Sequence, residues 1–195
     1  NFSYSLNLNK LNQNFQPTDG YRSTFSQSIP ILADDKSISN AYEYANYMKL
    51  RNETVFSFIF FAKSINNFDD DVRISKRIFI PSRKLRGFAA GKIGPKDSDD
   101  FIGGNYGTAM NLAATLPNFM KDLENIDFSL FLDTANVWGV DYNSSLDSNK
   151  IRSSTGIAVD WFTPIGPLSF SLASPITKSS TDETETFRFR IGTTF

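Results

Sequence analysis

The chain has 195 residues with 20 Lys and Arg, 21 Asp and Glu, no His and no Cys, so its formal net charge is −1. The absence of Cys and His excludes disulfide scaffolds, thiolate zinc sites, cysteine nucleophiles and Ser-His-Asp triads within it. The nearly neutral charge argues against nucleic-acid binding, which requires an excess of Lys and Arg. No run of apolar residues is long enough for a transmembrane helix.

Apolar and polar residues alternate along most of the chain, and this period of two residues predicts β-strands. The pattern recurs in nine segments, which in chain order are 2–9, 21–29, 42–50, 54–62, 106–116, 128–135, 151–161, 168–173 and 186–195. In 54–62 the adjacent residues Phe60 and Phe61 leave open which face is apolar. No segment shows a sustained helical period, so we expect almost no helix.

The segments between the predicted strands have the composition of turns and loops. Pro17-Thr18-Asp19-Gly20 is typical of a tight turn, and the links 117–125 and 139–150 are longer and polar. The segment 64–105 is much longer than an ordinary loop and contains the acidic run Asp69-Asp70-Asp71. That run is one candidate for a divalent cation, but its spacing lacks the EF-hand pattern. We expect neither a resident metal nor a cofactor.

An alternating all-β chain is compatible with a soluble β-sandwich or with a membrane barrel. Strands of about ten residues match the roughly 9–11 residues with which a tilted strand crosses a bilayer. Aromatic residues such as Trp138 and Trp161 stand at the ends of apolar faces, as expected at a membrane interface. We therefore predict an all-β fold, an antiparallel transmembrane β-barrel. The odd number of strands and the start within an alternating pattern predict that residues 1–195 are part of a larger barrel.

Several short motifs occur in the order found in one known family. They are Leu85-Arg86-Gly87-Phe88 and Gly103-Gly104-Asn105 in the long loop, Phe131-Leu132-Asp133-Thr134 in the sixth segment, and the terminal run 187–195. Together they resemble the family of the outer-membrane protein assembly factor BamA. The resemblance implies a sixteen-stranded barrel whose nine C-terminal strands lie in this chain. It also implies periplasmic domains upstream and a loop of about 64–105 that folds into the lumen.

The resemblance implies a site inside the barrel as well. In the motif Leu85-Arg86-Gly87-Phe88, the guanidinium of Arg86 would pair with Asp133 on the barrel wall, beside Phe131. Alternation independently places Phe131 and Asp133 on one strand face. A guanidinium in a narrow lumen requires a carboxylate partner, and Gly87 would permit a tight turn. From the residues alone, Arg86 would be interpreted as an exposed loop cation.

The function that the resemblance implies is the non-enzymatic folding and insertion of β-barrel proteins in the bacterial outer membrane. The last strand would act as a weakly paired edge that templates an incoming strand. This edge is expected to act as a gate, and the positions expected to form it are Phe187, Phe189, Ile191, Gly192 and Phe195. Expected partners are the lipid bilayer, nascent barrel proteins and the lipoproteins of an assembly complex, with no nucleic acid.

Other functions stay open at the level of sequence. The segment 64–105 would constrict a passive outer-membrane pore equally well. A translocation or secretion transporter of the same superfamily is the closer alternative. A hydrolase is disfavoured because the chain has no His, and Asp97, Asp99 and Asp100 are more simply explained as solvated loop charges.

Overall fold

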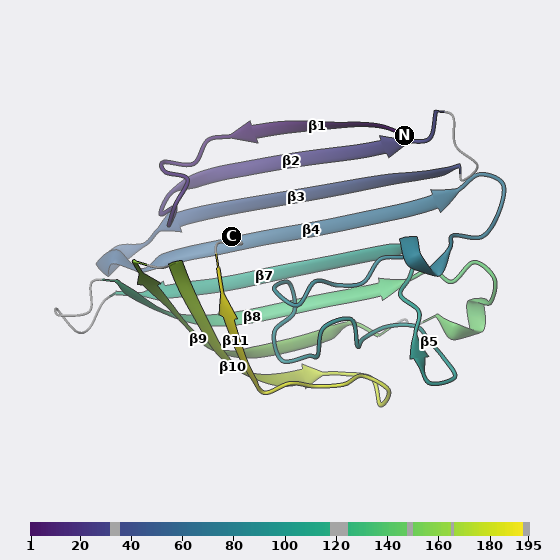
Figure 1. Ribbon diagram of the computed structural model, residues 1–195. Helices are drawn as coiled ribbons and strands as arrows, with labels where there is room; N and C mark the ends of the chain where they lie inside the picture. Colours follow the sequence, from purple (N-terminus) through teal and green to yellow (C-terminus); the bar gives the residue numbers. More distant parts are fainter. Residues whose placement is uncertain (32–35, 118–124, 148–149, 165, 193–195) are drawn as a thin grey trace.

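The computed structural model describes residues 1–31, 36–117, 125–147, 150–164 and 166–192. Nine antiparallel strands form one curved sheet in which neighbours follow the chain order (Figure 1). Their bounds are β1 (Phe2–Asn9), β2 (Gly20–Ile29), β3 (Ser37–Lys49), β4 (Val55–Asn67), β7 (Tyr106–Leu116), β8 (Ile126–Trp138), β9 (Arg152–Thr163), β10 (Gly166–Thr177) and β11 (Phe187–Ile191). Strands β1 and β11 form the two edges of this sheet.

All nine predicted strands are present, and several are longer than predicted. Strands β3 and β4 pair from Ser37 opposite Asn67 to Lys49 opposite Val55. Backbone hydrogen bonding therefore continues beyond the residues whose side chains alternate, and the long loop begins at residue 68 rather than 64. The last strand is shorter than the predicted 186–195, because Gly192 has a φ of +117° and leaves the extended conformation. Phe195 lies outside the described residues.

The two faces of the sheet differ as the alternation predicts. On the convex face, Leu130, Ile157 and Leu172 are 50%, 48% and 49% exposed, which suits contact with lipid. The structure also settles the faces of β4. Phe60 contacts the convex-face ring of Tyr42, whereas Phe61 packs against a cluster on the concave face.

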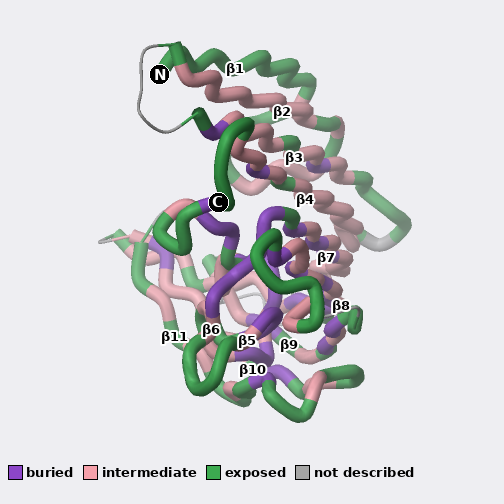
Figure 2. The backbone as a smooth tube through the Cα atoms, turned by 90° about the vertical axis from the view of Figure 1, so that its right-hand side faces the viewer, coloured by how far each residue is buried: buried purple, intermediate pink, exposed green. Residues whose placement is uncertain are grey.

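The long loop, residues 68–105, lies in the hollow of the sheet (Figure 2). It contains the short helix η2 (Ile74–Lys76) and a small ribbon of β5 (Lys96–Asp97) and β6 (Asp100–Phe101). Its apolar residues form the core of the molecule with small residues of β7 and β8. This core consists of Ile80, Leu85, Phe88, Ile93, Ala109, Ala135 and Val137. The loop is therefore packed against the concave wall along its apolar side chains.

Regular helix is limited to one-turn segments in the described ranges. Besides η2 these are η1 (Arg51–Glu53) and η3 (Ser144–Leu146), both in links between strands. None of the helices formed by the described residues has the length and apolar character needed to cross a membrane. The soluble sandwich alternative is wrong, because the described strands form one large sheet and a small ribbon rather than two packed sheets.

Candidate functional site

The centre of the candidate site is an ion pair between the loop and strand β8. The Arg86 guanidinium donates from Nε to Asp133 Oδ2 and from Nη2 to Asp133 Oδ1, each at 2.7 Å. The backbone N–H of Arg86 donates to Oδ2 as well, at 3.0 Å. The Asp133 side chain is 0% exposed and that of Arg86 is 16% exposed. A bidentate pair at this depth holds both the position and the orientation of the loop.

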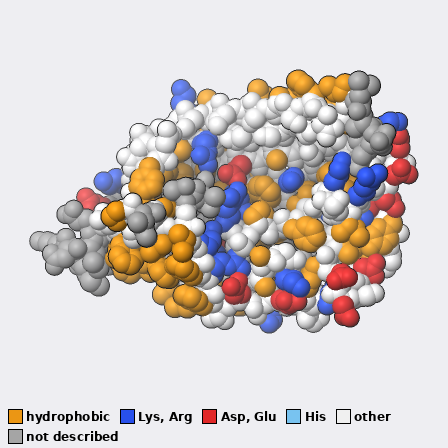
Figure 3. All heavy atoms as spheres, viewed as in Figure 1, with side chains coloured by type: hydrophobic (Ala, Val, Ile, Leu, Met, Phe, Trp, Pro, Cys, Tyr) orange, Lys and Arg blue, Asp and Glu red, His pale blue; other side chains and the backbone are white. Residues whose placement is uncertain are grey.

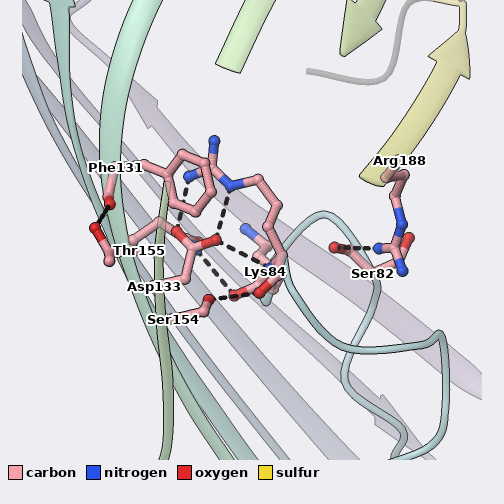
Figure 4. Close-up of polar contacts among 9 residues, drawn as sticks. Ser82, Lys84, Phe131, Asp133, Ser154, Thr155 and Arg188 are labelled. Atoms are coloured by element: carbon pink, nitrogen blue, oxygen red, sulfur yellow. Dashed lines mark hydrogen bonds and ion pairs between the residues drawn. The ribbon is translucent and has the colours of Figure 1, made fainter. Parts of the chain in front are cut away.

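The wall around this pair follows from the pleat of β8. Alternation places Phe131 and Asp133 on the concave face, two residues apart. The guanidinium carbon of Arg86 lies 3.5 Å from the centroid of the Phe131 ring, so the ring packs against the face of the cation. Figure 4 shows Phe131 and Asp133 side by side on the strand, with the loop beside them.

Asn111 is a member of the site that the sequence analysis did not single out. It stands directly opposite Asp133 on β7, and its Nδ2 donates to Asp133 Oδ1 and to the Lys84 carbonyl, each at 2.9 Å. The Asn111 amide thus links the Asp133 carboxylate to the loop backbone at Lys84, in addition to the direct bonds from Arg86. Alternation places Asn111 on the same strand face as Ala109, but only the pairing of β7 with β8 brings it to Asp133.

Gly87 lies where the loop passes close to the wall formed by β9 and β10. Its φ is +86°, and a Cβ there would stand 3.1 Å from Ser154 Cβ and 3.2 Å from Ala173 Cβ. The Ser154 hydroxyl of β9 donates to the Arg86 carbonyl. A side chain at position 87 would therefore be strained and would also push the loop off β9 and β10.

Leu85 and Phe88 flank this contact with apolar packing. Their exposed fractions are 2% and 1%, and both belong to the core cluster between the loop and the sheet. Full burial of such side chains stabilises a fold by about 1.5–3 kcal/mol each. Leu85 and Phe88 thus supply apolar packing on either side of the polar anchor at Arg86 and the close contact at Gly87.

The loop is also fastened to the last hairpin, which sequence reasoning missed. Three backbone hydrogen bonds join 87–92 to 183–185: Ala89 to Glu183, Glu183 to Lys92, and Glu185 to Gly87, at 3.0, 3.1 and 3.1 Å. Arg188 of β11 adds two side-chain bonds, one to the Ser82 carbonyl at 2.8 Å (Figure 4) and one to the Phe88 carbonyl at 2.7 Å. One loop therefore links β8 to β11 across the hollow.

Two further ion pairs fasten inner segments to the wall, one from the loop and one from the link between β10 and β11. Lys84 Nζ lies 2.6 Å from Glu43 Oε2 of β3. Arg152 of β9 forms a bidentate pair with Asp182, at 2.9 and 3.0 Å, and both side chains are 0% exposed. Arg152 also donates to the Asn136 side chain at 2.8 Å. Each cation stands inside the barrel wall with a carboxylate beside it, as desolvation requires.

The base of the loop is fixed outside the strands, at Asp141. Its carboxylate accepts from the Val72 N–H and Arg77 Nη2, each at 2.7 Å, and from Asn105 Nδ2 at 3.0 Å. Burial alone would raise the pKa of Asp141, but these donors and the Arg77 charge outweigh it and hold the pKa below its ordinary value. Among the described residues, no group of three or more His, Cys, Asp or Glu is arranged to hold a metal ion.

The last strand presents an apolar outer face and an unpaired edge. Phe187, Phe189 and Ile191 point outward and are 53%, 45% and 69% exposed. Phe189 packs on Phe170 of β10, with ring centroids 4.9 Å apart. Gly192 ends the strand and donates its N–H to the Pro167 carbonyl at 3.0 Å. In the part of the chain that the structure describes, β11 pairs with β10 alone.

A comparison with family models decides the family. The model of the Omp85 superfamily domain matches residues 1–195. The chain belongs to the Omp85 superfamily. Its nine strands and long inner loop are thus those of an Omp85 domain, and the prediction of an antiparallel transmembrane barrel fold is confirmed.

Similar Omp85 proteins carry the name outer membrane protein assembly factor BamA. The protein of Neisseria meningitidis serogroup B is 33% identical over 140 residues, covering 57% of this chain and 17% of that protein. The protein of Neorickettsia risticii is 28% identical over 200 residues, covering 99% of this chain and 27% of that protein. The matched part of this chain thus spans about a sixth to a quarter of the length of these relatives.

A solved Omp85 structure shows the same arrangement. The crystal structure of BamA from Haemophilus ducreyi lacking POTRA domains 1–3 is similar with a TM-score of 0.87 and 33% sequence identity. The match covers 96% of this chain and 41% of that chain. The predicted resemblance to BamA and the location in the outer membrane are therefore confirmed.

Proposed function

We propose that this chain is the C-terminal part of a sixteen-stranded barrel that folds other β-barrel proteins and inserts them into the outer membrane. The observation that carries the proposal is the double attachment of the loop, to Asp133 on β8 and through Arg188 to β11. This attachment supports the last strand from inside the barrel while its outer edge stays unpaired in the described sheet. The names of the similar Omp85 proteins support the same function.

In this proposal β11 templates an incoming strand by β-augmentation. An exposed strand edge offers a row of backbone N–H and C=O groups, and pairing with it satisfies them within the bilayer. Within the described residues, β11 is paired in register with β10 over Phe187–Ile191, whereas β10 pairs with β9 from Gly166 to Thr177. The short pairing and the bend at Gly192 favour an edge that opens at small cost.

The mechanism we propose needs no covalent chemistry. The free energy would come from burial of the client's apolar face in lipid and from completion of its hydrogen bonds. The sequence contains no phosphate-binding Gly-x-x-x-x-Gly-Lys motif that would point to nucleotide hydrolysis. Nascent barrel proteins and the lipoproteins of an assembly complex are the partners that this function implies.

The role of Arg86 gives the direct test. The full-length protein would be placed in liposomes and the folding of a barrel client followed by its gel mobility. We expect Arg86→Ala to reduce client folding at least tenfold, because the loop loses its anchor on β8. Arg83→Ala is the matched control, because Arg83 lies on the same loop, is exposed and forms none of these bonds. Normal folding of the client by Arg86→Ala would refute the proposed role of the loop.

A passive pore is distinguished by conductance in the same liposomes. A pore function predicts a steady large conductance that is independent of client and unchanged by Arg86→Ala. Assembly predicts client folding that depends on the anchored loop.

A further inference from the structure

The outer face of β11 already restricts the kind of strand that can pair with it. Phe187, Phe189 and Ile191 point toward lipid and are about half exposed or more. Cross-strand neighbours lie on the same face, so a partner strand would place apolar residues beside them. Its intervening residues would then face the hollow, beside Arg188 and Arg190.

The two inward cations of β11 differ in their surroundings. Arg188 is fully engaged, because it donates to Glu185, to the Ser82 carbonyl and to the Phe88 carbonyl. Arg190 is half-buried and makes no hydrogen bond or ion pair within the described part of the chain. A guanidinium at a partly desolvated position gains most from a carboxylate at hydrogen-bonding distance.

The charges around Arg190 are of both signs. Asp160 exerts the largest charge effect and attracts Arg190, whereas Arg86, Arg188 and Arg83 repel it. Figure 3 shows Lys and Arg side chains gathered along the hollow face of the molecule. The edge of β11 therefore presents a positive strip toward the lumen.

The cross-strand register explains why Asp160 does not complete the pair. A polar row runs across the sheet, with Asp127 of β8 opposite Asp160 of β9, Asp160 opposite Ser169 of β10, and Ser169 opposite Arg190. The Ser169 hydroxyl donates to Asp160 Oδ1, so the uncharged Ser169 stands between the carboxylate and Arg190. In the proposed sixteen-stranded barrel, the next position in this row belongs to the strand that pairs with β11, which is the barrel's own first strand when the barrel is closed and a client strand during templating.

We infer that Arg190 selects the incoming client strand, favouring one with Asp or Glu at the lumen-facing position opposite Arg190 and apolar residues on either side of it. The inference rests on the proposed function, in which β11 pairs with a client strand. An opposed pair of unlike charges stabilises strand pairing, and like charges oppose it. Arg190 thus sets charge specificity and register at an edge whose backbone bonds would accept any strand.

The test measures pairing directly in the full-length protein in native membranes. A cysteine replaces Ile191, and a second cysteine is placed at a lipid-facing position of the edge strand of a truncated barrel client whose assembly stalls. Three versions of the client are compared. They carry Asp, Asn or Lys at the lumen-facing position next to the client's cysteine, which is the position opposite Arg190. We expect the disulfide yield to fall in the order Asp, Asn, Lys, by about two- to five-fold per step.

Charge reversal supplies the decisive comparison. Arg190→Glu should invert the order, so that Lys gives the highest yield, and Arg190→Gln should flatten it. Lys63→Glu is the matched control, because Lys63 is exposed on β4, away from β11, and this change alters the net charge equally. The original order should persist in this control. Disulfides that form equally with all three clients, or an order unchanged by Arg190→Glu, would overturn the inference. A lack of disulfides with every client would instead count against templating by β11.

Discussion

Asp133 accepts three hydrogen bonds from a single residue, Arg86, two from its guanidinium and one from its backbone N–H. Asn111 donates to the same carboxylate from the adjacent strand. A side chain with no exposed surface thus fixes both the side chain and the main chain of the loop. This contact converts a long polar segment into a rigid part of the lumen wall.

Removal of the carboxylate should release the loop. Asp133→Ala leaves the half-buried Arg86 cation without its partner, and breaking a buried pair in this way costs about 3–5 kcal/mol. We expect faster protease cleavage within residues 80–92 and loss of client folding. Asp99→Ala, an exposed carboxylate of the same loop, should leave both properties unchanged. Unchanged protection of the loop in Asp133→Ala would contradict the anchoring role.

The close approach of Gly87 to the wall can be separated from its backbone conformation. Gly87→Ala adds both the strain of a positive φ and a Cβ at 3.1 Å from Ser154, whereas Gly91→Ala has a φ of +69° but open contacts, the nearest at 3.7 Å. We expect each change to destabilise the loop by about 1 kcal/mol through the backbone. Gly87→Ala should cost more, which denaturant unfolding of the purified full-length barrel would measure. Equal losses would mean that the wall contact adds nothing.

The Arg188 clamp predicts a coupling between the last strand and the loop. Arg188→Gln removes the two bonds to the Ser82 and Phe88 carbonyls while keeping a polar side chain. Amide hydrogens of residues 82–92 should therefore exchange faster, by about five- to thirty-fold for the loss of roughly 1–2 kcal/mol. Arg190→Gln, on the same strand face, should leave this exchange unaltered, since Arg190 does not bond to the loop. Slow exchange in Arg188→Gln would show that the backbone bonds to 183–185 suffice.

The base of the loop should loosen in acid. The donors around Asp141 depress its pKa below the ordinary value of 3.8, so the ionised carboxylate is the form that stabilises the folded loop. This contribution is complete above the unfolded pKa and is lost as the pH falls through the lower folded pKa. Hydrogen exchange at Val72 should accelerate in that window below about pH 4. Asp141→Asn should remove the pH dependence, and its persistence in that variant would assign it to another group.

The sequence by itself determined that nine strands are present and, except in β4, which of their side chains share a face. Alternation alone placed Phe131 and Asp133 inward and Leu130 outward, because a pleated strand directs successive side chains to opposite sides. Local pattern could not locate the true strand ends, since pairing partners extend β3 and β4 and a positive φ at Gly192 shortens β11. The sequence also could not decide which face of β4 points inward. Only the packing of Phe61 against the loop showed this.

Only the tertiary structure decided which residues complete the site. Arg86 and Asp133 lie 47 residues apart, and their meeting was implied by resemblance to a family rather than by local spacing. Asn111, Ser154 and Arg188 became visible as partners only once the loop was seen to cross from β8 to β11. The reason is physical: strand periodicity is a local property of the backbone, whereas a loop's path through a lumen depends on contacts between segments far apart in the chain.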